Sequence, residues 1–282
     1  MGSIRSILEY YALSHTAYLH AKGEPATQLL VDRLDPQPDE RILELGFGTG
    51  GTLLRMADHF TGTEFYGLEG SKLMLQSTLA RFRNCKSDAP VRLALYAEPG
   101  KIPFEDRLFD RVYVESVLGI QVGEELPAAL KEIFRVLKPG GRLVFNETLW
   151  LESTTPEEFH RINRSCMEHF GIIQANAMYP YRADWERLLT EIGFQVRSME
   201  SVDALLEQPL PPRPLPPHNK SRSFSMRGAL RAKMSSRMRK NYAEFERVSK
   251  MLMRGKQYME GNLVVAEREF EENVFPDLVE ED

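Results

Sequence analysis

The segment from Ile42 to Gly51, ILELGFGTGG, constrains the fold more than any other part of the chain. A short apolar run without helical period predicts a buried strand, and glycines follow it at once, then the helical pattern GTLLRMADHF. Glycines permit positive φ angles and let a ligand lie against the backbone, while the N-terminus of the next helix offers unpaired N–H groups. A strand, a glycine turn and a helix in this order predict an α/β unit whose turn binds a ligand.

The same alternation of strands and helices continues along the first 200 residues, which indicates a parallel sheet with helices on both faces. Six further strands are expected at residues 63–70, 91–98, 111–118, 141–149, 193–200 and 261–270. Helices are expected at 4–20, at 24–34, at 51–60, after a Ser71 cap, before Pro139, and twice within 156–193.

An acidic residue, Glu69, ends the second predicted strand, 19 residues after Gly50. A carboxylate at this place can accept hydrogen bonds from both hydroxyls of a ribose. The alternative is that Glu69 is only an acid at the N-terminus of the helix that Ser71 caps.

Two later segments carry a resemblance to a family. AEPGKIPFEDRLFDRVYVESVL and EIFRVLKPGGRLVFNE resemble the corresponding blocks of class I S-adenosylmethionine-dependent methyltransferases, most closely the group that includes ubiquinone, sterol and tocopherol methyltransferases. The matching positions are Glu98, Ile102-Pro103-Phe104, Phe109-Asp110 and Arg135 to Gly141. The resemblance covers residues 19–150 well and the last strands loosely. It implies a Rossmann-like, seven-stranded, mostly parallel α/β sheet with an antiparallel last strand and a helical lid.

The resemblance also implies the cofactor, S-adenosylmethionine, and the residues that hold it. Glu44 and the turn should contact its methionine part and ribose, Glu69 the ribose hydroxyls, and Glu98 the adenine amino group. Pro99 departs from the family pattern because it has no N–H to donate to the adenine ring. The full expected set is Tyr11, Tyr18, His20, Glu44, Gly46, Phe47, Gly48, Gly50, Glu69, Gly70, Met74, Ala97, Glu98, Pro99, Glu115 and Ser116.

The catalytic residues stay unassigned, and no metal site is expected. Methyl transfer from a sulfonium needs alignment and a dry site, and it needs a general base only where the acceptor is protonated. Candidates that could face the acceptor are His15, His20, Glu115, Glu147 and Tyr181, each with an ordinary structural interpretation beside it. Core packing is as good an explanation for Tyr10, Tyr11 and Tyr18 as a role in covering the cofactor.

The chain carries a net charge of −5, which argues against a general nucleic-acid binder. The segment from His218 to Tyr258 nevertheless has twelve Lys and Arg against two Glu. We expect one long helix here, after the connector, with a solvated cationic face and a methionine-rich apolar stripe formed by Met226, Leu230, Met234, Met238, Phe245, Val248 and Leu252. The alternative is that Arg231, Arg237, Arg239 and Lys240 attract an anionic acceptor or a membrane surface.

We therefore expect a cytoplasmic methyltransferase that acts on a small organic acceptor, either anionic or apolar. Four regions are expected: an N-terminal helical cap (1–35), a cofactor-binding core (36–202), a proline-rich connector with a basic lid (203–260), and a last strand with an acidic tail (261–282). A homodimer is compatible with the sequence, and no window is apolar enough to span a membrane. Other interpretations are aminopropyl transfer, lyase chemistry, or a non-catalytic binding protein whose basic helix engages an acidic partner.

Overall fold

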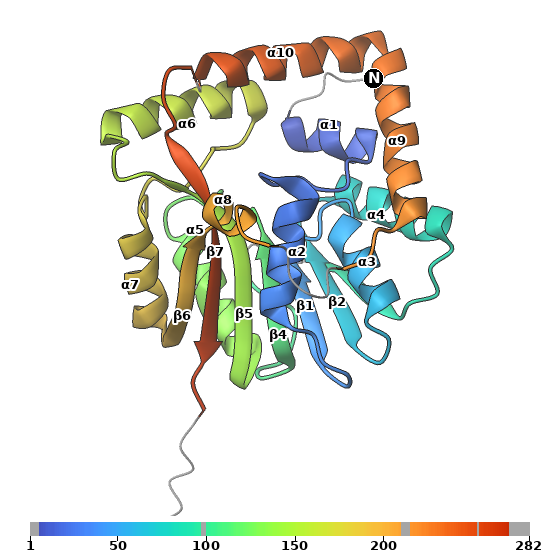
Figure 1. Cartoon of the computed structure of the whole chain (residues 1–282), viewed down its shortest axis with the longest axis vertical. Helices are drawn as coiled ribbons and strands as arrows, with labels where there is room; N and C mark the ends of the chain where they lie inside the picture. Colours follow the sequence, from blue (N-terminus) through green and yellow to red (C-terminus); the bar gives the residue numbers. More distant parts are fainter. Residues whose placement is uncertain (1–5, 97–99, 210–214, 253, 271–282) are drawn as a thin grey trace, which may run out of the picture.

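A seven-stranded sheet forms the centre of the molecule (Figure 1). The computed structural model describes residues 6–96, 100–209, 215–252 and 254–270 of the 282-residue chain. The strands are β1 (Arg41–Leu45), β2 (Glu64–Glu69), β3 (Val91–Leu95), β4 (Phe109–Glu115), β5 (Leu137–Trp150), β6 (Phe194–Ser201) and β7 (Met259–Arg268). Their order in the sheet is β3-β2-β1-β4-β5-β7-β6, and β7 runs antiparallel to both of its neighbours. The expected Rossmann-like fold with an antiparallel last strand is confirmed.

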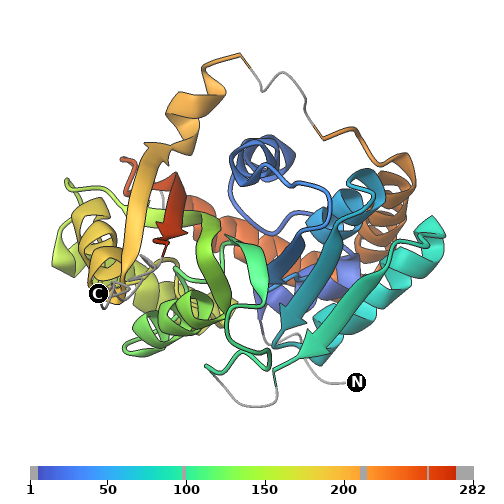
Figure 2. The same ribbon diagram turned by 90° about the horizontal axis from the view of Figure 1, so that it is seen from below.

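Helices cover both faces of this sheet, as the view from below in Figure 2 makes plain. On one face, apolar side chains of α2 (Gly23–Leu34) and α3 (Gly51–His59) pack on the strands, joined by the short α8 (Val202–Leu206). On the other face, α5 (Glu125–Val136) and α7 (Arg182–Ile192) do the same, with Trp185 fully buried. Helix α4 (Lys72–Cys85) packs beside α3, and its first turn is capped by Ser71 as expected.

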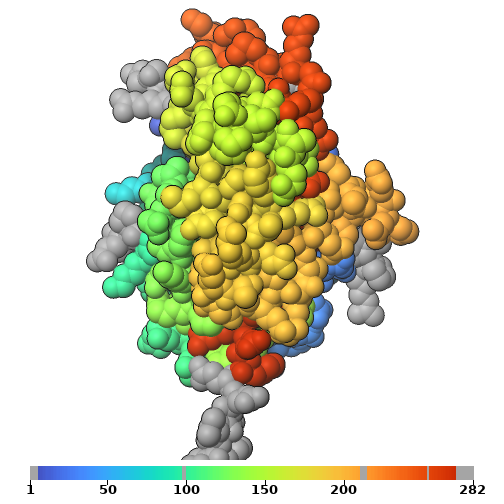
Figure 3. Space-filling model, turned by 90° about the vertical axis from the view of Figure 1, so that its left-hand side faces the viewer, coloured from blue at the N-terminus to red at the C-terminus, as the bar shows by residue number. Residues whose placement is uncertain are grey.

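A third group of helices lies across the carboxyl ends of the parallel strands, at the top of Figure 1. It consists of α1 (Ile7–Ser14), α6 (Pro156–Phe170) and α10 (Ser236–Leu252), which share a separate apolar cluster. Helix α6 lies above α7 on the side of the molecule shown in Figure 3. Helix α9 (Asn219–Met234) runs down the opposite side and packs on α1 and α4. The helices α1, α6 and α10, called the roof below, therefore cover the side of the sheet where the parallel strands end.

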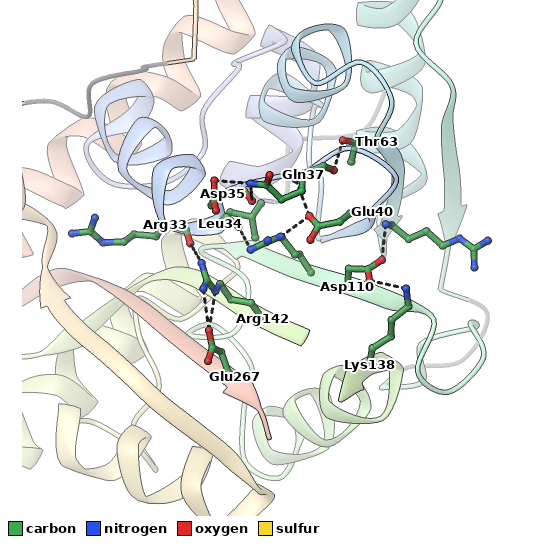
Figure 4. A network of polar contacts seen from close by, with 12 residues as sticks. Arg33, Leu34, Asp35, Gln37, Glu40, Thr63, Asp110, Lys138, Arg142 and Glu267 are labelled. Atoms are coloured by element: carbon green, nitrogen blue, oxygen red, sulfur yellow. Dashed lines mark hydrogen bonds and ion pairs between the residues drawn. The ribbon is translucent and has the colours of Figure 1, made fainter. Parts of the chain in front are cut away.

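The amino ends of the strands are closed by polar contacts (Figure 4). Arg142 donates to the carbonyl oxygen of Arg33 at 3.0 Å and pairs with Glu267, so the end of α2 is tied to β5 and β7. Arg111 on β4 pairs with Glu40 at 2.6 Å and donates to the carbonyl oxygen of Leu34. Ion pairs thus join α2 to the sheet at the end of the strands that lies opposite the roof.

Three expectations about helix limits need correction. Helix α1 ends at Ser14, well before residue 20, because His15 adopts a left-handed φ of 54° and starts a loop. Helix α5 ends at Val136, two residues earlier than the expected stop before Pro139, because the backbone is already extended at Leu137 and a proline disfavours helical backbone at the residue before it. The long helix expected after the connector is broken at Ser235 into α9 and α10.

The apolar stripe expected along residues 226–252 is only half correct. On α10, Phe245, Val248 and Leu252 are buried as expected. On α9, the methionine and leucine side chains of the stripe are exposed, and the inward face is made of small or different residues: Ser221, Phe224, Gly228 and Ala232. The physical reason is close approach, because a Cβ on Gly228 would lie 2.2 Å from the carbonyl oxygen of Ser14.

Candidate functional site

A cavity of about 1240 Å³ lies between the carboxyl ends of the parallel strands and the roof helices. It spans the point where the strand order reverses, between β1 and β4, which is where open α/β sheets bind their ligands. Single-ligand pockets commonly measure about 300–1,000 Å³. The cavity therefore has room for two ligands side by side.

The glycine turn after β1 forms part of the floor of this cavity. Gly46 has a φ of 76°, and a Cβ there would lie 2.3 Å from Cγ2 of Val117. At Gly51 a Cβ would lie 2.3 Å from the carbonyl oxygen of Ala17, so the loop after α1 rests directly on the start of α3. Larger residues cannot occupy these two positions without displacing their neighbours.

The carboxylate of Glu69, at the end of β2, faces the glycine turn. Its Oε2 accepts from the backbone N–H of Gly48 at 2.8 Å, and its Oε1 accepts from the N–H groups of Gly70 and Ser71 at 2.8 and 2.9 Å. A carboxylate offers about four acceptor positions. The group is thus fixed in orientation and keeps capacity for a hydroxyl of a ligand.

Two further acids lie at the floor of the cavity. Glu44 is buried and accepts from the hydroxyl of Tyr113 at 2.7 Å. Burial raises the pKa of Glu44 well above its ordinary value, and the negative charge of Glu115 acts in the same direction. Glu115 accepts from the hydroxyls of Thr27 and Thr52 at 2.8 and 2.7 Å.

His20, in the loop after α1, contacts the same acid. Its Nε2 lies 3.1 Å from Oε1 of Glu115 and 3.0 Å from Oγ1 of Thr27. A carboxylate only accepts hydrogen bonds, so Nε2 carries the proton in this contact. The N-terminal loop, α2, α3 and β4 are therefore joined at a single carboxylate.

Glu147 on β5 lines the cavity but is committed to the backbone. Its carboxylate accepts from the N–H groups of Val117, Leu118 and Gly119 at 2.8, 2.7 and 3.0 Å. Burial raises the pKa of Glu147 to about 7, although these three hydrogen bonds oppose the shift. Glu147 holds the loop after β4 in place.

The upper half of the cavity differs in character from the floor. Apolar side chains from the roof and the adjoining loops line it: Ile7, Leu8, Tyr11, Ile120, Cys166, Phe170, Ile172, Ile173, Tyr242 and Phe245. Of the described residues that line the whole cavity, His20 and Lys250 are the basic ones, against seven glutamates. Lys250 itself pairs with Glu246 at 3.0 Å. The cavity is therefore acidic at its floor and apolar beneath its roof.

The structure brings most of the expected site residues to this cavity. Its lining includes Tyr11, His20, Glu44, Gly46, Phe47, Gly48, Glu69, Gly70, Met74, Glu115 and Ser116. Ala97, Glu98 and Pro99 lie outside the described residues. Two positions differ from expectation. Tyr18 turns away and accepts from the buried guanidinium of Arg55 at 3.0 Å, and Gly50 faces Thr78 of α4.

Two of the candidate residues for the acceptor lie elsewhere. The Nδ1 of His15 is 2.7 Å from Oγ of Ser77, and its ring packs on Phe224. Tyr181 donates its hydroxyl hydrogen to the carbonyl oxygen of Thr154. Sequence reasoning missed Thr27 and Thr52, because no local pattern marks a helix threonine whose partner lies more than 60 residues away.

Comparison with known proteins agrees with this geometry. Residues 43–145, which contain the glycine turn, Glu69 and Glu115, match the family model described as "Methyltransferase domain". YodH of Bacillus subtilis (strain 168), described as an uncharacterized methyltransferase, is 30% identical over 191 residues, covering 67% of this chain and 74% of YodH. The chain belongs to the class I S-adenosylmethionine-dependent methyltransferases. As a member of this family, the chain takes the methyl group from S-adenosylmethionine.

The methyltransferase also resembles larger enzymes over part of their length. Phosphoethanolamine N-methyltransferase 1 of Zea mays is 29% identical over 154 residues, which cover 54% of this chain and 29% of the maize enzyme. The structure of phosphoethanolamine N-methyltransferase 2 of Haemonchus contortus with S-adenosyl-L-methionine has a TM-score of 0.66 at 19% identity, covering 93% of this chain and 56% of that one. This second likeness shows the shared fold.

Proposed function

We propose that this methyltransferase transfers a methyl group from S-adenosylmethionine, bound over the glycine turn, to an apolar acceptor without a phosphate group, bound between α1, α6 and α10. The observation that carries the proposal is the division of the cavity into an acidic floor and an apolar upper half. The carboxylate of Glu115 on the floor suits a cationic sulfonium, and the aliphatic and aromatic lining above suits an apolar molecule.

The cofactor half fits S-adenosylmethionine on two features of the chain. The glycines leave the surface of the turn free of side chains, so that a ligand can lie against its backbone, and a Cβ at Gly46 or Gly48 would also meet a neighbouring side chain. Glu69 is fixed in orientation at the rim of the turn and would accept from the ribose hydroxyls. The contacts expected of Ala97, Glu98 and Pro99 with the adenine stay predictions.

The acceptor half argues against a phosphorylated acceptor such as the one in the names of the maize and Haemonchus enzymes. A phosphate held in a partly buried site needs several charge-assisted donors. Among the described residues of the upper half, Lys250 is the one that carries such a charge, and it is paired with Glu246. An apolar acceptor needs no such donors.

The transfer itself asks little acid–base chemistry of the chain. The cofactor supplies an electrophilic methyl group, and the protein supplies alignment and exclusion of water. The roof helices close the cavity above the strands, and the loop held by Glu147 forms one wall of it. We propose that Glu147 is a positioning residue here, because both of its oxygens are committed to backbone N–H groups.

We also propose that the insertion from residue 203 to 260 acts as the lid of the acceptor site. Tyr242, Phe245 and Glu246 of α10 line the cavity, which supports this role.

In the described part of the chain, none of the helices has the length and apolar character needed to cross a bilayer. Cys85 and Cys166 are buried free thiols, and we keep the cytoplasm as the proposed location.

The test of this function is transfer of a labelled methyl group to two acceptor sets, apolar phenols and long-chain alcohols against phosphoethanolamine. We expect labelled product from the apolar set, with a mass gain of one methylene unit, and none from phosphoethanolamine. Ile173→Asp would place a carboxylate in the apolar half and should abolish transfer while cofactor binding persists. Met178→Asp is the matched control, because Met178 lies in the same loop but is 53% exposed and outside the cavity. Equal loss in both variants, or methylation of phosphoethanolamine alone, would overturn the proposal.

A further inference from the structure

The outward face of α9 carries three large apolar side chains in contact with solvent. Met226, Leu230 and Met234 are 72%, 59% and 75% exposed. They are spaced four residues apart, so they form one stripe about 12 Å long on a single side of the helix. Exposed single apolar residues are common, but three in register on one helix face mark a surface that is ready for contact.

This stripe is exposed although α9 is firmly docked by its opposite face. Gly228 lies against the backbone of Ser14, and Arg81 of α4 donates to the hydroxyls of Ser221 and Ser225 at 2.8 and 3.0 Å. The docked face consists of Ser221, Phe224, Gly228 and Ala232, and the three large aliphatic side chains Met226, Leu230 and Met234 lie on the other side of the helix. The large aliphatic side chains of α9 thus face away from the protein.

Cations flank the apolar stripe on both sides. At about 100° per residue, Arg227 and Arg231 lie on one side of it, and Arg222 and Lys233 lie on the other. Helix α9 has five Lys and Arg and no Asp or Glu. Arg222 pairs with Glu24, whereas Arg227, Arg231 and Lys233 form no ion pair with any residue that the structure describes.

We propose that α9 docks this methyltransferase onto the surface of an anionic lipid membrane. An apolar stripe bordered by Lys and Arg is the pattern of a helix that lies in the membrane interface, where the stripe enters the acyl boundary and the cations meet the headgroups. Charge complementarity supports this occupant, since the stripe lies between cations on a helix without acids, in a chain whose net charge is −5. The docking is weak and reversible, because the stripe is short, and it weakens with salt.

Other occupants fit the surface less well. A nucleic acid would call for aromatic side chains that stack on bases, and the outward face of α9 offers methionine and leucine instead. An acidic protein would use the cations but would leave the apolar stripe exposed to water. The proposal is separate from the identity of the acceptor, and it holds or fails independently of the methyl-transfer assays.

The experiment is co-sedimentation of the full chain with vesicles of phosphatidylcholine alone and with vesicles of phosphatidylcholine and phosphatidylglycerol in equal amounts. We expect binding to the anionic vesicles only, and release at high salt. Arg227→Gln with Arg231→Gln should lower the partition coefficient about 25-fold, at about fivefold for each cation. Met226→Ser with Leu230→Ser should lower it about tenfold. Binding of S-adenosylmethionine by each variant verifies that the fold is kept.

The matched control is Arg161→Gln with Arg164→Gln, which removes two exposed arginines from a surface helix, α6, at the far end of α10 (Figure 1). It makes the same change in net charge and should leave vesicle binding unchanged. Equal binding to neutral vesicles, an equal loss in the control, or no loss in either α9 variant would overturn the proposal. Tighter binding to polyglutamate or duplex DNA than to anionic vesicles would overturn it in favour of an acidic macromolecule.

Discussion

Replacing Glu69 by glutamine is the most direct probe of the cofactor site. The carboxylate accepts three backbone N–H groups and lies beside the glycine turn, so its oxygens are where ribose hydroxyls would donate. A hydrogen bond to a charged group contributes about 1.5–3 kcal/mol. Glutamine keeps one acceptor oxygen and loses the charge, so we expect the loss of one such bond, about 1.5–3 kcal/mol. The dissociation constant of S-adenosylmethionine should rise about 12- to 150-fold.

Calorimetric titration with the cofactor measures this change, and two controls give it meaning. Glu64→Gln makes the same chemical change at the start of the same strand, where the side chain is about half exposed and pairs with Arg41 and Arg92. It should leave the dissociation constant unchanged. A cofactor analogue without ribose hydroxyls should lose little further affinity in the Glu69 variant, because the two changes remove the same contact. Additive losses, or a dissociation constant within twofold of the wild type, would refute the assignment of Glu69.

Three other outcomes follow from the packing. Gly46→Ala should lower the free energy of unfolding, measured by urea denaturation, by about 1–3 kcal/mol and should weaken cofactor binding. Adding Val117→Ala should restore only part of the stability, because it removes the steric clash but leaves the left-handed φ of 76°. The pKa of Glu147 is about 7 in the folded protein and about 4.5 in the unfolded chain, so the folded state binds the proton more tightly. This proton binding stabilises the fold fully below about pH 4.5, and the stabilisation is lost as the pH rises toward 7. Glu147→Gln should flatten that decline in unfolding free energy, and an unchanged slope would contradict the cause given. Arg111→Met should lower the free energy of unfolding by about 1–3 kcal/mol, because it removes the ion pair with Glu40 and the hydrogen bond to the carbonyl oxygen of Leu34, yet it should not alter the cofactor dissociation constant.

Local patterns are enough to predict the sheet and the floor of the cavity. The run from Ile42 to Gly51 has an apolar strand, positive-φ glycines and a helix start, and each of these signals depends only on neighbours in the chain. The place of Glu69 at the end of the next strand follows from the parallel pairing of β1 and β2. Residues delivered by strand ends can therefore be assigned from the order of strands and turns along the chain.

Contacts between helices and loops could not be predicted in the same way. Thr27 and Thr52 meet Glu115 only because α2 and α3 cover the same face of the sheet, and neither threonine differs in its local sequence from a surface residue. Tyr18 is one of the residues expected at the cofactor, with core packing as the alternative, and its hydroxyl accepts a hydrogen bond from the buried guanidinium of Arg55 instead. A buried charge elsewhere in the fold decides the direction of this side chain.

The case of α9 shows why periodicity identifies a stripe but not the side on which it lies. A helical repeat of methionine and leucine is satisfied equally by a core and by an external apolar surface. Gly228 determines which side of α9 faces the protein, since the backbone of α1 lies 2.2 Å from the position where a Cβ would be. A side chain at position 228 would prevent that approach, and the large aliphatic residues of α9 lie on the opposite side, in solvent. A small residue opposite an apolar stripe thus indicates a helix that packs closely by its small face, and on this chain it is the same feature that exposes the cation-flanked stripe of α9.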